Sequence, residues 1–120
     1  KIMQAYRLVY EATEEGIRAA RPGNKASDLW RAMAAVLEAG GANVDPFGRM
    51  GHGLGMQLTE WPSNKIDDDT ILAPGMVMTI EPGIEFEPNR LMVHEENLLI
   101  TADGYQMLSR RALPEITVIE

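Results

Sequence analysis

Three side chains between positions 52 and 95 of this 120-residue sequence have types and positions suited to binding a metal ion. His52 lies between Gly51 and Gly53, which allow backbone and substrate to approach the imidazole closely. Glu81 ends one apolar run, and Glu95 lies in the middle of another. A buried carboxylate is unfavourable unless it is paired, protonated or bound to metal. Carboxylate oxygens suit hard divalent cations, and an imidazole completes a site for manganese, iron, cobalt or zinc.

A plainer interpretation stays open for each of these residues. Glu95 and its neighbour Glu96 could form surface ion pairs where a strand reaches solvent, and His52 could belong to a flexible glycine loop. What favours a metal site is the combination, because two carboxylates and a glycine-flanked histidine are harder to explain together than singly.

Two helices and then several strands must position these residues. Apolar side chains recurring every three or four positions predict a helix over 2–21, which Pro22 and the glycine after it end. A second helix is predicted over 27–39, with Ser27 or Asp28 as its N-cap.

Strands are predicted over 76–81, 91–101 and 105–108, with an Asp-Gly turn before the last. In the strand over 91–101, alternation places Glu95 and Asn97 on one face. Apolar residues occur on both faces of that strand, which predicts that both are covered. The predicted fold class is therefore α+β, with two helices packed on an antiparallel sheet.

Composition narrows the classes of function. The formal net charge is −7, which argues against a surface for nucleic acid or for an anionic membrane. The absence of cysteine excludes disulfides, cysteine-ligated metal sites and thiol catalysis. No apolar run approaches the length of a membrane-spanning helix and no signal peptide is visible, so we expect a cytoplasmic location.

Three motifs, taken in order, resemble those of a known enzyme superfamily. They are Gly-His-Gly-Leu-Gly over 51–55, Pro-Gly-Met-Val-Met-Thr-Ile-Glu-Pro-Gly over 74–83, and Glu-Glu-Asn over 95–97. Together they resemble the pita-bread-fold metallopeptidases, which include methionine aminopeptidase, prolidase, aminopeptidase P and creatinase. The spacing, 29 positions from His52 to Glu81 and 14 from Glu81 to Glu95, is most similar to the prolidase and aminopeptidase P branch.

The resemblance implies a ligand set and a reaction. His52, Glu81 and Glu95 would be metal ligands, with Glu95 bridging two divalent ions of manganese, cobalt, iron or zinc. Such ions activate water for attack on a peptide bond of the Xaa-Pro type or on a related C–N bond. Glu81 would shuttle the proton, so Glu81 and His52 are the expected catalytic residues.

The sequence also departs from the family pattern. The second histidine that usually follows the first by seven residues is Thr59, and the arginine often found two residues before the bridging glutamate is Val93. We expect Thr59 and Trp61 to contact substrate. We expect Asn97 to hydrogen-bond and orient a metal ligand without contacting the metal itself.

The two aspartate ligands of the family have no counterpart in strand context. The run Asp67-Asp68-Asp69 reads as a solvated loop. The resemblance therefore implies that residues 1–120 are the C-terminal portion of a pita-bread catalytic domain, offering three ligands and lacking activity in isolation.

The alternatives are a non-catalytic pita-bread module that binds a peptide or protein partner, and a metal-independent, creatinase-like amidinohydrolase. For the enzyme, the expected partner is a peptide or small amide substrate, with neither nucleic acid nor membrane involved. An exposed apolar sheet would also favour a homodimer.

Overall fold

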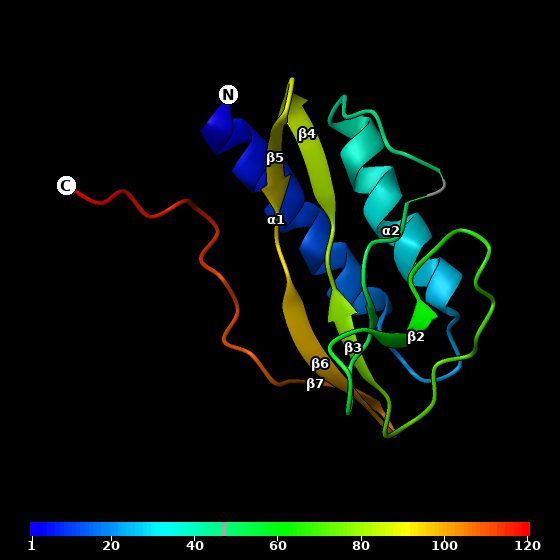
Figure 1. The fold of residues 1–120 in the computed structure, drawn as a ribbon. Helices are drawn as coiled ribbons and strands as arrows, with labels where there is room; N and C mark the ends of the chain where they lie inside the picture. The colour runs from blue at the N-terminus through cyan, green and yellow to red at the C-terminus, as the bar shows by residue number, and fades with distance from the viewer. Residues whose placement is uncertain (47) are drawn as a thin grey trace.

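Two helices that run in opposite directions cover one face of the sheet. The computed structural model describes residues 1–46 and 48–120, with α1 at Ile2–Ala19 and α2 at Ala26–Ala39 (Figure 1). The first helix ends two residues earlier than expected, because Pro22 disfavours helical backbone in the residue before it. Neither helix combines the length and apolar character of a membrane span within the described residues.

The expected N-cap of the second helix is wrong. Lys25 is the cap residue, and its backbone N–H donates to the carboxylate of Asp28, at 2.8 Å. Asp28 thus lies inside the helix and reaches back to the first turn. The Ser27 hydroxyl donates instead to Asp69 Oδ1, at 3.1 Å.

The strands form one five-stranded antiparallel sheet and one separate hairpin. The sheet has the order β2-β1-β3-β6-β7, and β4 pairs with β5. The sheet strands are His52–Gly53 (β1), Glu60–Ser63 (β2), Val77–Ile80 (β3), Glu96–Thr101 (β6) and Gly104–Met107 (β7); the hairpin strands are Gly83–Glu87 (β4) and Arg90–Val93 (β5).

The prediction of one continuous strand over 91–101 is wrong, because the structure has two strands in this range. β5 ends at Val93 and β6 begins at Glu96, so His94 and Glu95 belong to neither ladder. On the opposite side, Glu81 and Pro82 separate β3 from β4 in the same way. Pro82 has no N–H with which to continue the ladder. The two-stranded ribbon formed by β3–β4 and β5–β6 is therefore interrupted at one level along its length.

The core lies between the helices and the sheet. Buried side chains from α1 and α2 meet inward-facing residues of β3 and β6; the set includes Val9, Ala12, Leu29, Met33, Leu37, Met78, Ile80, Leu98 and Ile100. Helix and sheet approach closely at Gly16, where an added Cβ would lie 2.7 Å from both Ile80 and Met33.

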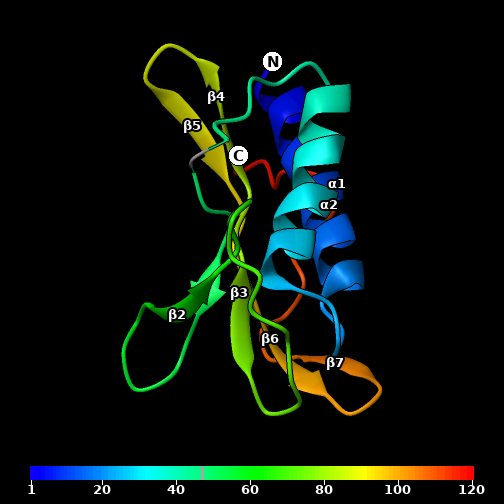
Figure 2. The ribbon, with the colours of Figure 1, turned by 90° about the vertical axis from the view of Figure 1, so that its right-hand side faces the viewer.

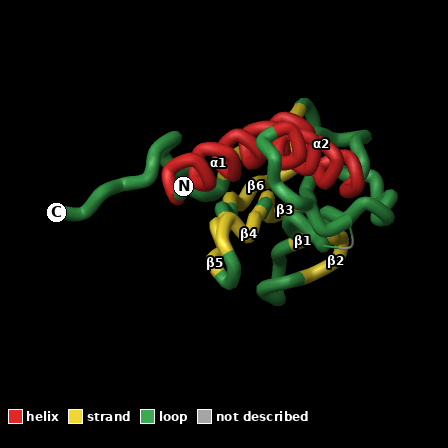
Figure 3. Tube along the Cα trace, turned by 90° about the horizontal axis from the view of Figure 1, so that it is seen from above, coloured by secondary structure: helices red, strands yellow, loops and turns green. Residues whose placement is uncertain are grey.

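The opposite face of the ribbon carries no helix. Seen from the side and from above, both helices lie on one side of the strands (Figures 2 and 3). Leu91 and Val93 on this open face are 67% and 50% exposed. The expectation that both faces are covered is therefore wrong for this chain, because its only two helices within the described residues pack on the same side.

Candidate metal centre

The structure brings the three sequence-predicted ligands together. His52 lies in β1, Glu81 directly follows β3, and Glu95 directly precedes β6. One ligand atom from each residue lies within 4.8 Å of the others, a cluster compatible with one shared cation. His52 is buried, Glu81 is partly buried and Glu95 is exposed, so the cluster opens toward solvent at its glutamate side.

The break in the ribbon is what places the two carboxylates opposite one another. Ile80 pairs with Glu96 on one side of the break, and Gly83 pairs with Val93 on the other. Between these pairs, the His94 N–H donates to the Pro82 carbonyl at 3.2 Å and keeps the two chain segments in contact. Glu81 and Glu95 can therefore approach each other without being paired partners in the sheet.

The backbone around His52 is held tightly. Its N–H donates to Thr79 Oγ1 at 3.0 Å, which ties β1 to β3. Gly51 has φ of +128°, and a Cβ there would lie 2.1 Å from the Thr79 carbonyl oxygen. Only glycine accommodates both this backbone conformation and this close approach.

The hydrogen bonding of the imidazole leaves one nitrogen for a ligand. His52 Nδ1 lies 2.8 Å from the Gly53 carbonyl oxygen, which is only an acceptor, so that bond requires the proton on Nδ1. Nε2 then carries the lone pair and lies 3.6 Å from Glu81 Oε1. This is the tautomer that a metal-binding histidine needs.

Electrostatics at Glu81 also fit a cation. Burial raises the pKa of its carboxyl group, and the nearby Glu95 carboxylate raises it further, while His52 and Arg49 act in the opposite direction. Two crowded carboxylates repel each other unless a positive charge lies between them. The donor set of one imidazole nitrogen and two carboxylates therefore suits a divalent metal ion.

Sequence reasoning missed a buried amide that supports this arrangement. Asn64 is fully buried, and its Nδ2 donates to the Thr79 carbonyl at 2.9 Å. Its N–H also donates to the Gly51 carbonyl, at 3.0 Å. Asn64 thus links Gly51, which precedes His52, to Thr79 of β3, whose hydroxyl accepts the His52 N–H. The sequence contains no signal for this role, because Asn64 follows a short strand in a position typical of loops.

Sequence reasoning also missed the anchoring of Glu96. This carboxylate is 3% exposed and accepts hydrogen bonds from Ser109 Oγ at 2.7 Å, Arg111 Nη1 at 3.1 Å and the Ala112 N–H at 2.8 Å. Arg111 also bonds Glu14 of α1 at 2.6 Å. The residue next to Glu95 is therefore fixed on the helix side of the strand, and the interpretation of Glu96 as a surface ion pair is wrong.

The other sequence-predicted site residues lie in different surroundings. Thr59 and Trp61 are exposed, Trp61 at 70%, and neither forms a hydrogen bond with the three ligands in the described part of the chain. The Asn97 side chain has a buried Oδ1 without a hydrogen-bond partner there. Their roles toward substrate and ligand therefore stay predictions.

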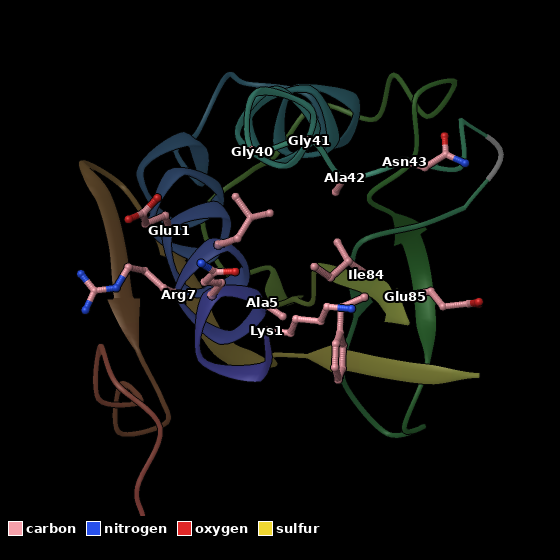
Figure 4. Close-up of a pocket in the computed structure, with 13 residues that line it drawn as sticks. Lys1, Ala5, Arg7, Glu11, Gly40, Gly41, Ala42, Asn43, Ile84 and Glu85 are labelled. Carbon is pink, nitrogen blue, oxygen red and sulfur yellow. The ribbon is translucent and has the colours of Figure 1, made fainter. Parts of the chain in front are cut away.

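Near the β4–β5 hairpin, described residues line two hollows. One includes Glu81 and lies between the hairpin and residues 43–45 and 48–50. The other lies between α1, the end of α2 and β4, and contains none of the three candidate ligands (Figure 4). The first hollow is thus the one that adjoins the cluster.

Comparison with known proteins agrees with this geometry. The model of metallopeptidase family M24 matches residues 1–102. The chain is 34% identical over 110 residues to the Xaa-Pro dipeptidase of Pyrococcus furiosus, covering 92% of this chain and 32% of that protein. It is 37% identical over 106 residues to the putative dipeptidase YkvY of Bacillus subtilis, covering 88% of this chain and 29% of that protein. The chain spans about a third of the length of these relatives.

Solved structures show the same relationship. The prolidase of Pyrococcus furiosus superposes with a TM-score of 0.84 at 33% identity, over 91% of this chain and 32% of that one. The dipeptidase PepE of Mycobacterium ulcerans superposes with a TM-score of 0.85 at 29% identity. The match covers 92% of this chain and 30% of that one. The expected pita-bread architecture, with two helices on an antiparallel sheet, is confirmed. By its motifs, fold and matched family model, the chain belongs to metallopeptidase family M24.

Proposed function

We propose that residues 1–120 form the C-terminal part of the catalytic domain of a hydrolase that cleaves Xaa-Pro peptides or related C–N bonds. The observation that carries this proposal is the cluster of His52, Glu81 and Glu95, whose ligand atoms lie within 4.8 Å of one another. The relatives named as Xaa-Pro dipeptidase and prolidase support the substrate class.

Each residue has a role in the proposed site. His52 would offer Nε2 as a ligand, and Glu81 and Glu95 would offer carboxylate oxygens, with Glu95 as the ligand common to two ions. Bound manganese, cobalt, iron or zinc would supply a more acidic water and polarise the scissile carbonyl. Glu81 would be the residue that takes up a proton from the attacking water and delivers it to the leaving nitrogen.

Three further contacts belong to the proposal. Thr59 offers a hydroxyl to substrate, and Trp61 an exposed apolar surface. Asn97 supports the ligand side of β6. The described residues offer three ligands of the roughly five that a two-metal site requires. We therefore expect the isolated 120 residues to bind metal weakly and to hydrolyse nothing.

Metal analysis of the full-length protein tests the proposal. We expect about two divalent ions per chain, with loss of metal and of Xaa-Pro hydrolysis in Glu81→Ala and Glu95→Ala variants. Glu38→Ala is the control, because Glu38 is an exposed acid on α2 and lies outside the cluster.

Two results would replace this function with another. Hydrolysis that survives exhaustive chelation would indicate a metal-independent, creatinase-like amidinohydrolase. A protein that holds no metal and hydrolyses no peptide or amide would indicate a module that only binds a peptide or a protein.

A further inference from the structure

One buried amide contacts the chain segments that carry two of the three proposed ligands. The Asn64 side chain is fully buried, and its Nδ2 donates to the Thr79 carbonyl at 2.9 Å and to the Met50 carbonyl at 3.4 Å. Main-chain bonds hold Asn64 in place, since its N–H donates to the Gly51 carbonyl and its carbonyl accepts the Met50 N–H at 2.8 Å. The amide therefore lies at the junction between β3 and the residues that precede β1.

The two residues that accept hydrogen bonds from this amide also hold the ligands themselves. The Met50 carbonyl accepts the Glu81 N–H at 2.9 Å. The Thr79 hydroxyl accepts the His52 N–H at 3.0 Å. A single residue thus separates Asn64 from each of the two ligands in this hydrogen-bond network. A change at Asn64 would therefore alter the placement of one ligand relative to the other.

The unpaired oxygen of this amide indicates that stability alone does not account for the side chain. Asn64 Oδ1 is buried and has no hydrogen-bond partner among the described residues. Turning the amide over would place Oδ1 against two carbonyl oxygens, which are acceptors only, so the observed orientation is the one that forms hydrogen bonds. A buried acceptor without a partner is unfavourable and offsets much of what the donated bonds contribute to stability. The distinctive contribution of the amide is the link between the two carbonyls.

We propose that Asn64 is a positioning residue that sets the metal affinity of the candidate centre by fixing His52 relative to Glu81. This inference rests on the proposed function, because it takes both residues as metal ligands. Groups that hydrogen-bond and orient metal ligands typically change metal affinity or activity by about 10- to 100-fold when they are mutated. Asn64 acts on the main chain that carries the ligands, and it joins two segments that are far apart in the sequence.

Titration of the metal-free, full-length protein with cobalt tests this role. The variant Asn64→Leu keeps the approximate size of the side chain and removes the donor. We expect it to raise the Kd for Co²⁺ by about 10- to 100-fold. We also expect it to change the visible absorption spectrum of bound Co²⁺, because that spectrum reports the arrangement of the ligands around the ion.

Asn24→Leu is the matched control for this variant. Asn24 Nδ2 also donates to a main-chain carbonyl, that of Ala19 at 2.8 Å, and Asn24 lies outside the ligand cluster. Because the two sites are independent, Asn24→Leu should change the Kd for Co²⁺ by less than about 2-fold even if it lowers Tm. Equal effects of the two variants on cobalt binding would assign Asn64 a general structural role and overturn the inference.

A pair of variants at Thr79 keeps the test decisive if Asn64→Leu does not fold. Thr79→Val preserves the shape of the side chain and removes the hydroxyl that accepts the His52 N–H, so it should weaken cobalt binding by about 10-fold or more. Thr79→Ser keeps that hydroxyl and should restore most of the affinity. Cobalt binding that is unchanged in Thr79→Val would remove the proposed link from Asn64 to His52.

The possible outcomes separate this inference from the proposed function. Cobalt binding that Asn64→Leu leaves unchanged would overturn the role of Asn64 alone. Cobalt binding that Asn64→Leu weakens, in a protein that hydrolyses no peptide or amide, would overturn the proposed function and leave that role intact. A wild-type protein that binds no Co²⁺ would overturn both.

Discussion

Gly51 holds the backbone next to His52 in a conformation and a close contact that suit only glycine. An alanine there would combine a left-handed backbone with a Cβ 2.1 Å from the Thr79 carbonyl oxygen and 2.5 Å from Asn64 Nδ2. Backbone strain and overpacking together should lower the free energy of unfolding by about 3 kcal/mol or more. Chemical denaturation of Gly51→Ala measures the loss.

The variant Gly23→Ala separates the effect of backbone strain from the effect of overpacking. Gly23 has φ of +93° but nothing within 4 Å of an added Cβ, so only the backbone term of about 1–2 kcal/mol should appear. Equal losses in the two variants would mean that the contact between β1 and β3 does not require glycine.

A second residue-scale prediction concerns Asp68, the half-buried member of the Asp67–Asp69 run. Burial tends to raise the pKa of its carboxyl group, but hydrogen bonds from Thr70 and from the Ser63 N–H, with the charge of Lys65, outweigh burial and hold that pKa below its ordinary value of 3.8. Because the folded pKa is lowered, the ionised group contributes stability above pH 3.8, and this contribution is lost as pH falls through the folded pKa.

Thermal unfolding measured as a function of pH tests whether the ionised Asp68 carboxylate stabilises the fold. Wild type should exceed Asp68→Asn in Tm at pH 5–7, and the two should converge in strong acid. Asp67→Asn is the control, because Asp67 is exposed and accepts no hydrogen bond in the described part of the chain. A gap between wild type and Asp68→Asn that widened on acidification would contradict the assignment.

At the scale of elements, Arg111 connects α1 and β6 to the C-terminal segment, the residues 108–120 that follow β7. It bonds Glu14 and the Tyr10 carbonyl on α1 and the buried Glu96 on β6. Arg111→Met would remove a charged partner from a carboxylate whose side chain is 4% exposed. We expect a loss of about 2–3 kcal/mol in the free energy of unfolding, measured with denaturant.

Arg7→Met gives the comparison for this variant. Arg7 also joins α1 to the C-terminal segment, through Glu115, but both side chains are mostly exposed. Its loss should be below about 1 kcal/mol. Similar losses would show that docking of the segment, rather than the burial of Glu96, determines the stability.

The same elements show what could be read from the sequence. Helical periodicity predicted both helices to within two residues at each end, and the glycine, proline and glutamate motifs predicted the cluster of His52, Glu81 and Glu95. The alternation of side chains between two faces did not locate the break before Glu96, although a run of four polar residues over 94–97 separates two apolar runs there. The contacts of Glu96 with Arg111 depend on how the chain returns after β7, which no local pattern encodes.

At the scale of the whole molecule, the open face should determine association. Leu91 and Val93 are 67% and 50% exposed on the face without helices, and β2 and β7 are edge strands of the sheet. Burying such apolar surface is favourable, and an exposed sheet edge invites pairing with another chain. We therefore expect the 120-residue chain to form homodimers at tens of micromolar, as measured by sedimentation equilibrium.

Substitutions identify the surface responsible. Val93→Lys places a charge on the open face and should shift the chain toward monomer. Leu113→Lys makes a comparable change at a residue that is 65% exposed in the C-terminal segment, and it should leave the dimer unchanged. A monodisperse wild-type monomer would contradict the prediction outright. A dimer that is sensitive to Leu113→Lys and not to Val93→Lys would move the interface from the open face to the segment beside α1.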